Sequence, residues 1–237
     1  MGENKDKVRT RLFKPIGYAK TDFPSKFGIP RQSGILDMLE SEIRLEPGFR
    51  HPDVFRGLEG FSHIWVIWDF SEISDGDWSP TVRPPRLGGN EKVGVFASRS
   101  PYRPNPVGLS CVRLIRVDPE AGKLVVTGLD LVDGTPVYDL KPYVPHTDCR
   151  PDAAGGFSDA VCGTRLQAKA DPVLLDRLPE SKRAALIRIL EEDPRPAYQK
   201  DPDRVYGFPF AGFEIRFRAD DEAKTVLLTD VLPIGNS

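Results

Sequence analysis

Hydrophobic and polar residues alternate along much of the chain, which is typical of β-strands that bury one face. The clearest case lies in residues 108–118, where we expect two faces, one formed by Cys111, Arg113, Ile115 and Val117 and the other by Val112, Leu114 and Arg116. The turn residues DPEAGK come next and KLVVTGLDLV then returns, so this part predicts a β-hairpin. Residues 11–20 and the segment VYDLKPYVPHTD are also expected to be extended, whereas ILDMLESEIRLEP fits a short helix or a strand.

The segment LEGFSHIWVIWDF, residues 58–70, has a different pattern. It is apolar on both faces from Ile64 to Trp68, which predicts a strand buried on both sides and central to a sheet. We expect its aromatic residues in the core, namely Phe61, Trp65, Trp68 and Phe70.

Helical patterns appear only in the last third of the chain. Asp171-Pro172 is a typical helix start, and a second helix is expected from Glu180 to Glu192 with Leu186, Ile189 and Leu190 as its buried stripe. A terminal hairpin follows, because Phe213, Ile215 and Phe217 alternate with charged residues. The pattern predicts a mainly β protein: a compact β-barrel over residues 8–148, a small-residue linker, and a small α+β C-terminal domain over residues 155–237.

Composition narrows the class of protein. The chain has 237 residues, of which 39% are hydrophobic and 29% charged, and 23 prolines with 21 glycines disfavour long helices. No run approaches the roughly 20 apolar residues of a membrane span, and MGENKDKVRTR lacks the apolar centre of a secretory signal, so we expect a cytoplasmic protein. The three cysteines and three histidines are scattered, which argues against a disulfide framework and a bound metal.

Charge is concentrated in one region. The chain carries a net charge of −2, yet residues 83–116 hold seven Lys or Arg residues and one acid, Glu91. This asymmetry indicates an anionic ligand on one face of an otherwise acidic protein.

Within that region, KVGVFA is expected to be a short strand that leads into SRSPYRPNP. Arg103 and Asn105 each precede a proline, which restricts their backbone to extended geometry. Prolines have no backbone N–H, so the segment cannot lie inside a sheet and is expected to form an exposed arch at a strand end. Such a rigid display of arginine suits a carboxylate or phosphate, whereas the alternative is a stiff loop with solvated arginines.

Three further patterns suggest binding residues. GLDLVDGTPVYDLKPY places acids and Lys141 on adjoining strand ends, and GIPRQSG offers Arg31 and Gln32 for hydrogen bonds to a base or phosphate. His63 is a candidate base, although a histidine beside a buried strand is more often part of the core. The chain has no P-loop, GxGxxG, GxSxG or HExxH motif, which excludes the commonest nucleotide hydrolases, Rossmann proteins, esterases and zinc proteases.

Several of these segments together resemble one family. IPRQSG, RGLEGFSHIWVIWDF, PTVRPPRLGGNEKVGVFASRSPYRPNPVGLS and GLDLVDGTPVYDLKPYVPH are similar to the TsaA-like, or TrmO, family of tRNA N6-methyltransferases. The resemblance implies a non-Rossmann β-barrel that binds S-adenosylmethionine and assembles as a homodimer. The implied reaction is methyl transfer to N6 of threonylcarbamoyladenosine, beside the anticodon of a threonine tRNA.

The resemblance also implies roles for individual residues. The cofactor pocket would contain Pro30, Arg31, Gln32, His63, Arg99, Leu109, Asp133, Gly134 and Thr135. The substrate would meet Arg83, Arg86, Arg103, Asn105 and Lys141, with the first two suited to tRNA phosphates. The catalytic base stays open between Asp139, Tyr143, His63 and the carboxylate of the substrate. Two other hypotheses are a non-catalytic RNA-binding barrel, and a methyltransferase that acts on another RNA or a small molecule.

Overall fold

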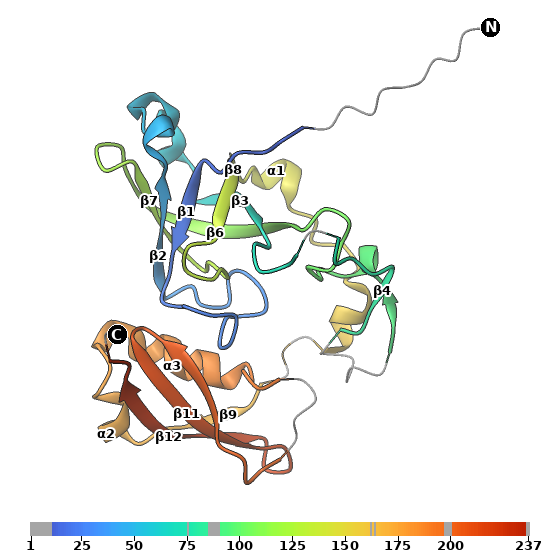
Figure 1. The fold of residues 1–237 in the computed structure, drawn as a ribbon, viewed down its shortest axis with the longest axis vertical. Helices are drawn as coiled ribbons and strands as arrows, with labels where there is room; N and C mark the ends of the chain where they lie inside the picture. Colours follow the sequence, from blue (N-terminus) through green and yellow to red (C-terminus); the bar gives the residue numbers. More distant parts are fainter. Residues whose placement is uncertain are drawn as a thin grey trace, which may run out of the picture.

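The computed structural model describes residues 11–74, 76–84, 91–161, 163, 165–196 and 201–235. Six strands close into an antiparallel barrel in the order β1-β2-β7-β6-β3-β8 (Figure 1). Their bounds are Gly17–Lys20 (β1), Glu40–Leu45 (β2), His63–Asp69 (β3), Val107–Asp118 (β6), Lys123–Thr127 (β7) and Pro136–Pro142 (β8). The predicted barrel and the β6–β7 hairpin are therefore confirmed, and ILDMLESEIRLEP contributes a strand, β2.

Alternate residues of each strand point into the barrel, and apolar residues at these positions form its core. Ile43, Ile64, Val66, Leu124 and Val126 are fully buried there. The prediction that β3 is buried on both faces is wrong, since Trp65 and Ile67 on its outer face are partly exposed. Phe61 is also not a core residue and exposes 37% of its surface.

The segment KVGVFA does not enter the barrel. Only Val93–Gly94 (β5) is a strand, and it pairs with Thr81–Val82 (β4) in a two-stranded ribbon. A 3-10 turn at Val95–Ala97 then leads to the arch, residues 98–106, which ends where β6 begins. The other short helical turns are Pro47–Phe49, Pro52–Phe55, Leu58–Gly60, Pro145–Asp148 (α1) and Gly156–Val161.

The C-terminal part forms a separate sheet, which we call the C-terminal sheet, with strand order β10-β11-β12-β9 (Figure 1). Its elements are Gln167–Lys169 (β9), Pro172–Leu175 (α2), Glu180–Glu191 (α3), Tyr206–Phe210 (β10), Phe213–Asp220 (β11) and Thr225–Pro233 (β12). The Asp171 carboxylate accepts a hydrogen bond from the Val173 amide, which confirms the predicted helix start. Leu186, Ile189 and Leu190 are buried as expected.

The connection between β1 and β2, residues 21–39, joins two barrel strands but packs its apolar residues against the C-terminal sheet. Phe23, Leu36 and Leu39 lie in the hydrophobic core of the C-terminal sheet, although they precede it by more than a hundred residues. Gly28 in this connection has φ +83° and lies so close to Phe208 that a Cβ atom would be 2.3 Å from its ring. Only glycine fits both the backbone angle and the space.

The antiparallel order of the strands determines where the connections meet. Residues 21–39, 70–106 and 128–135 join β1 to β2, β3 to β6 and β7 to β8, so all three lie at the same end of the barrel. We call this the loop end. Among the described residues, no helix is long and apolar enough to cross a membrane.

Candidate active site at the loop end of the barrel

The loop end brings together two segments that the sequence singled out separately. The Arg99 guanidinium in the arch donates a hydrogen bond to the Gln32 side-chain oxygen in the first connection, at 2.6 Å. The Gln32 side chain is a neutral amide and leaves the charge of Arg99 uncompensated. No described carboxylate forms an ion pair with Arg99. The guanidinium charge is thus available to an anionic ligand.

A cleft of about 800 Å³ opens beside this contact. Its described lining includes four cationic side chains, those of Arg31, Arg83, Lys92 and Arg99, and no carboxylate. Its other lining residues are Gln32, Ser79, Thr81, Val82, Pro84, Ser98, Ser100, Pro101, Tyr102 and Phe157. A cleft of this size, with cations and aromatic rings in its walls, suits a nucleotide-sized anion.

Two predicted substrate residues in the arch differ in role. The Arg103 guanidinium donates to the main-chain oxygens of Ser98 and Ser100, at 3.1 and 3.4 Å, so it braces the arch from within. Asn105 is exposed at the surface. The arch therefore owes its shape to Arg103 as well as to its prolines.

A carboxylate that the predicted set of site residues omits lies at the same end. Asp130 accepts a 2.5 Å hydrogen bond from the Ser110 hydroxyl, and Ser110 in turn accepts one from the Trp68 indole at 2.9 Å. Burial raises the pKa of the Asp130 carboxyl, while the hydrogen bond from Ser110 and the charge of Arg99 act in the opposite direction. Its place just after a buried strand, in GLDLVDG, was the available sequence signal.

The predicted cofactor residues Asp133, Gly134 and Thr135 form a turn that is held by β1. The Asp133 carboxylate pairs with Lys20 at 2.8 Å and accepts from the Thr21 amide at 2.9 Å. The Gly134 amide donates to the main chain of β1, and the Thr135 hydroxyl is buried against Val132. These contacts fix the start of the first connection, which carries Arg31 and Gln32.

Three other predicted residues lie on the outer face of the barrel. Leu109 and Asp139 flank Ile67 in register, one from β6 and the other from β8, and Lys141 lies two pairs further along, opposite Trp65. Asp139 and Lys141 form an ion pair at 2.8 Å. The structure thus groups these side chains with each other and not with the cleft.

His63 and Tyr143 lie near the opposite end of the barrel. β3 runs from His63, paired with Arg113, to Asp69, paired with Val107 beside the arch. At ~3.3 Å per residue, this places His63 about 20 Å from the loop end. Partial burial, followed by the neighbouring Cys149, raises the pKa of Tyr143, which keeps the phenol protonated near neutral pH. Within one chain, neither residue reaches the cleft.

The remaining predictions concern residues outside the described part of the chain, and metal binding. Arg86 lies outside the described residues, as do residues 197–200 of DPRPAYQK. No group of three or more His, Cys, Asp or Glu side chains able to hold a metal occurs in the described part of the chain.

A closed antiparallel barrel with a cationic cleft at its loop end defines a non-Rossmann class of protein. Residues 18–149 match the tRNA-methyltransferase O N-terminal domain and residues 165–233 match the TrmO C-terminal domain. The chain therefore belongs to the TrmO family.

Individual relatives agree with this assignment. The chain is 38% identical to the tRNA (adenine(37)-N6)-methyltransferase of Escherichia coli over 219 residues, which cover 88% of this chain and 93% of that protein. It is 41% identical over 208 residues to a putative S-adenosylmethionine-dependent methyltransferase, RcsF, of Pseudomonas aeruginosa, covering 84% of this chain and 88% of that one. The crystal structure of TrmO from Pseudomonas aeruginosa superposes with a TM-score of 0.78 at 30% identity, covering 97% of this chain and all of that one.

Proposed function

We propose that this protein is an S-adenosylmethionine-dependent tRNA methyltransferase. Its substrate is threonylcarbamoyladenosine beside the anticodon of threonine tRNA, and the methyl group goes to N6. The observation that carries the proposal is the cleft whose described lining brings together the cationic side chains of Arg31, Arg83, Lys92 and Arg99. Relatives that match most of the chain and are named as tRNA adenine N6-methyltransferases support it.

The residues of the cleft fit the cofactor. Arg31 and Arg99 would hold its carboxylate, since guanidinium groups bind carboxylates at two points. The Gln32 amide can hydrogen-bond the adenosine, and the rings of Tyr102 and Phe157 offer apolar contact to the base. When bound, S-adenosylmethionine supplies a methyl group attached to a cationic sulfur.

The substrate carries a second set of negative charges. Arg83 and Lys92, at the ribbon side of the cleft, are placed to meet tRNA phosphates or the threonyl carboxylate. A site that pairs this carboxylate rejects plain adenosine, because a cation would then remain unpaired. Holding the N6 nitrogen in line with the methyl group contributes up to ~7–11 kcal/mol to the rate through positioning.

The proton on N6 must leave as the methyl group arrives. Asp139, Tyr143 and His63 lie away from the cleft of their own chain, so the carboxylate of the substrate is the simplest acceptor there. We add Asp130 to the candidates, because burial raises the pKa of its carboxyl and so makes the carboxylate a stronger base than an ordinary aspartate.

Methylation of purified tRNA tests the proposal directly. Threonine tRNA that carries the threonylcarbamoyl group is incubated with the protein and S-adenosylmethionine, then digested to nucleosides for mass spectrometry. We expect one added methyl group on the modified adenosine, and a rate at least about tenfold lower for Arg99→Ala. Failure to bind the cofactor would contradict the proposal and favour the RNA-binding barrel, whereas cofactor binding with no methyl transfer to any tRNA would favour a methyltransferase that acts on a small molecule. Methyl transfer to another nucleoside would instead favour a different RNA substrate.

We also propose a homodimer. Val107, Leu109 and Ile115 expose 41, 56 and 42% of their surface on the outer face of β6, and exposed apolar surface of this kind is typical of protein contacts. A second copy on this face would cover Leu109, Asp139 and Lys141, which lie outside the cleft of their own chain. Light scattering during size-exclusion chromatography should give the mass of two chains, and the mass of one chain would rule the dimer out.

A further inference from the structure

Arg195 is the one buried charged side chain among the described core residues. It lies beyond the end of α3, and its guanidinium bonds to both oxygens of Asp193, at 2.7 and 2.9 Å, and to Asp221 at 2.7 Å. Only 4% of its side chain is exposed, whereas its two partners are partly exposed. A two-point contact of this kind fixes the orientation of Asp193 as well as its distance.

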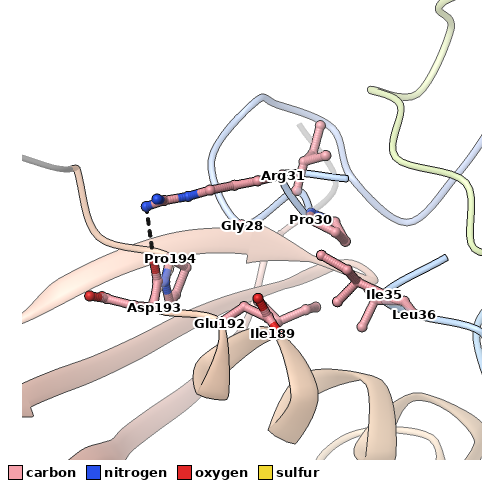
Figure 2. Close-up of a pocket in the computed structure, with 10 residues that line it drawn as sticks. Gly28, Pro30, Arg31, Ile35, Leu36, Ile189, Glu192, Asp193 and Pro194 are labelled. Carbon is pink, nitrogen blue, oxygen red and sulfur yellow. Dashed lines mark hydrogen bonds between the residues drawn. The ribbon is translucent and has the colours of Figure 1, made fainter. Parts of the chain in front are cut away.

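The main chain at Asp193 is unusual and points toward the barrel. Asp193 has φ +56°, a left-handed angle that aspartate adopts only occasionally. Its carbonyl oxygen accepts a hydrogen bond from the Arg31 guanidinium at 3.3 Å, as Figure 2 shows. The Arg195 guanidinium binds the side chain of the same residue, and this contact orients the Asp193 carbonyl toward Arg31.

The surrounding contacts press the same connection against the C-terminal sheet. Pro30 and Ile35 face Ile189 and Pro194 around a cavity of about 20 Å³, which leaves room for about one water molecule (Figure 2). Gly28 lies against the ring of Phe208. The backbone on the N-terminal side of Arg31 is therefore packed closely against the C-terminal sheet, and Arg31 extends from it toward Asp193.

We propose that Arg195 is a positioning residue for the cofactor cleft, acting through the Asp193 carbonyl on Arg31 and thereby on the neighbouring Gln32–Arg99 contact. This inference rests on the proposed function, since it takes Arg31 as a cofactor-binding residue. Precise binding sites need such support, because an arginine on a connection loses more side-chain freedom on binding than one already held in place. The C-terminal sheet accordingly acts on the cleft indirectly, since it contributes none of the described lining residues.

Two variants and one control separate positioning from simple stability. Arg195→Met removes the charge and all of the hydrogen-bond donors, and Arg195→Lys keeps a charge but loses the planar contact in which two nitrogens meet the two Asp193 oxygens. Arg177→Ala is the matched control, because Arg177 also bonds a carboxylate and a main-chain oxygen of this sheet, at Asp230 and Val231, and is absent from the lining of the cleft.

The first measurement needs no ligand. Hydrogen exchange of the amides in residues 28–36 should accelerate in both Arg195 variants and stay at the wild-type rate in Arg177→Ala. The second is calorimetric titration with S-adenosylmethionine, in which Arg195→Met should raise Kd about tenfold, equivalent to ~1.4 kcal/mol, and Arg195→Lys should not restore wild-type affinity. Wild-type protein that failed to bind the cofactor would contradict the proposed function, while the exchange result would still decide the mechanical role of Arg195.

A double-mutant cycle tests whether Arg195 affects cofactor binding through Arg31. If Arg195 acts through Arg31, then Arg195→Met should change Kd little in a chain that already carries Arg31→Ala. Additive effects of the two substitutions would overturn the proposal. So would Arg195 variants that lower the unfolding temperature while residues 28–36 and the Kd remain as in the wild type.

Discussion

The burial of the Asp130 carboxyl lowers the stability of the fold, and the residue lies next to the proposed site. Its carboxyl is largely screened from water, and burial is the main reason why its pKa is raised. Below about pH 3.9 the group is protonated in both the folded and the unfolded chain and does not affect stability. As the pH rises toward the raised pKa, the unfolded chain ionises first, so the free energy of unfolding falls until the folded form ionises too. A carboxylate kept at this cost is expected to serve binding or catalysis.

Replacing Asp130 with asparagine should therefore separate stability from function. We expect the stability of Asp130→Asn, relative to the wild type, to increase as the pH rises from about 4 to 8, because the variant has no proton to lose. Its affinity for S-adenosylmethionine should fall at least about tenfold, through loss of a charged group. Urea unfolding across this pH range and calorimetric titration measure the two effects.

Asp53→Asn provides a control, because Asp53 is an exposed carboxylate paired with Arg56, away from the loop end. It should leave the cofactor affinity unchanged. A stability difference between Asp130→Asn and the wild type that does not depend on pH would contradict the assigned shift.

The sequence predicted several residues that line the cleft, but not which groups each of the predicted site residues contacts. The sequence singled out Arg31, Gln32 and Arg99, and the structure places all three in the lining of one cleft, with Gln32 and Arg99 in direct contact. It could not show that Arg103 braces its own arch, because that depends on where the main-chain oxygens of Ser98 and Ser100 point. Nor could it show that Asp133 is engaged by Lys20, which lies 113 residues away.

β6 shows why a strand pattern can be right in type and wrong in detail. The predicted alternation holds from Leu109 to Arg113, but the pairing with β7 shifts between Leu114 and Arg116. A bulge of this kind inserts one extra residue, so every later side chain changes face. As a result, Val117 packs toward the barrel core and does not share the outer face with Cys111. Periodicity alone gives no signal for such an insertion.

Gly108 in the same strand is a packing requirement. It pairs with Trp68 across the sheet, and a Cβ atom at this position would lie 2.2 Å from the indole ring. We expect Gly108→Ala to lower the free energy of unfolding by about 1–3 kcal/mol, because the ring must move and its bond to Ser110 is disturbed. Urea unfolding measures the change. Gly48→Ala, where the new methyl group meets nothing within 4 Å, should stay within about 0.5 kcal/mol of the wild type. Equal stability of the two variants would refute this account of Gly108.

Long-range packing was the part of the molecule that sequence patterns could not reveal. The barrel, the hairpins and the helices follow from local periodicity, but the gathering of three connections at one end follows from strand order. The packing of residues 21–39, which join two barrel strands, into the core of the C-terminal sheet depends on contacts across most of the chain length. A proline- and glycine-rich connection looks like an ordinary loop in sequence, whereas Phe23 and Leu36 in it are as buried as any core residue.

Phe23 offers a test of whether the two cores are mechanically joined. It is fully buried in the core of the C-terminal sheet and its ring packs against Phe210, with the ring centroids 5.4 Å apart. Phe23→Ala should lower the stability of that sheet by about 3–5 kcal/mol, because a large buried ring is lost and a cavity remains. Hydrogen exchange of the β11 amides reports this directly. Phe27→Ala, in the same connection but at a residue that is 49% exposed in the wild type, should change the exchange little. If Phe23→Ala left β11 as protected as in the wild type, the connection would be a surface loop and its proposed role in coupling the C-terminal sheet to the cleft would fail.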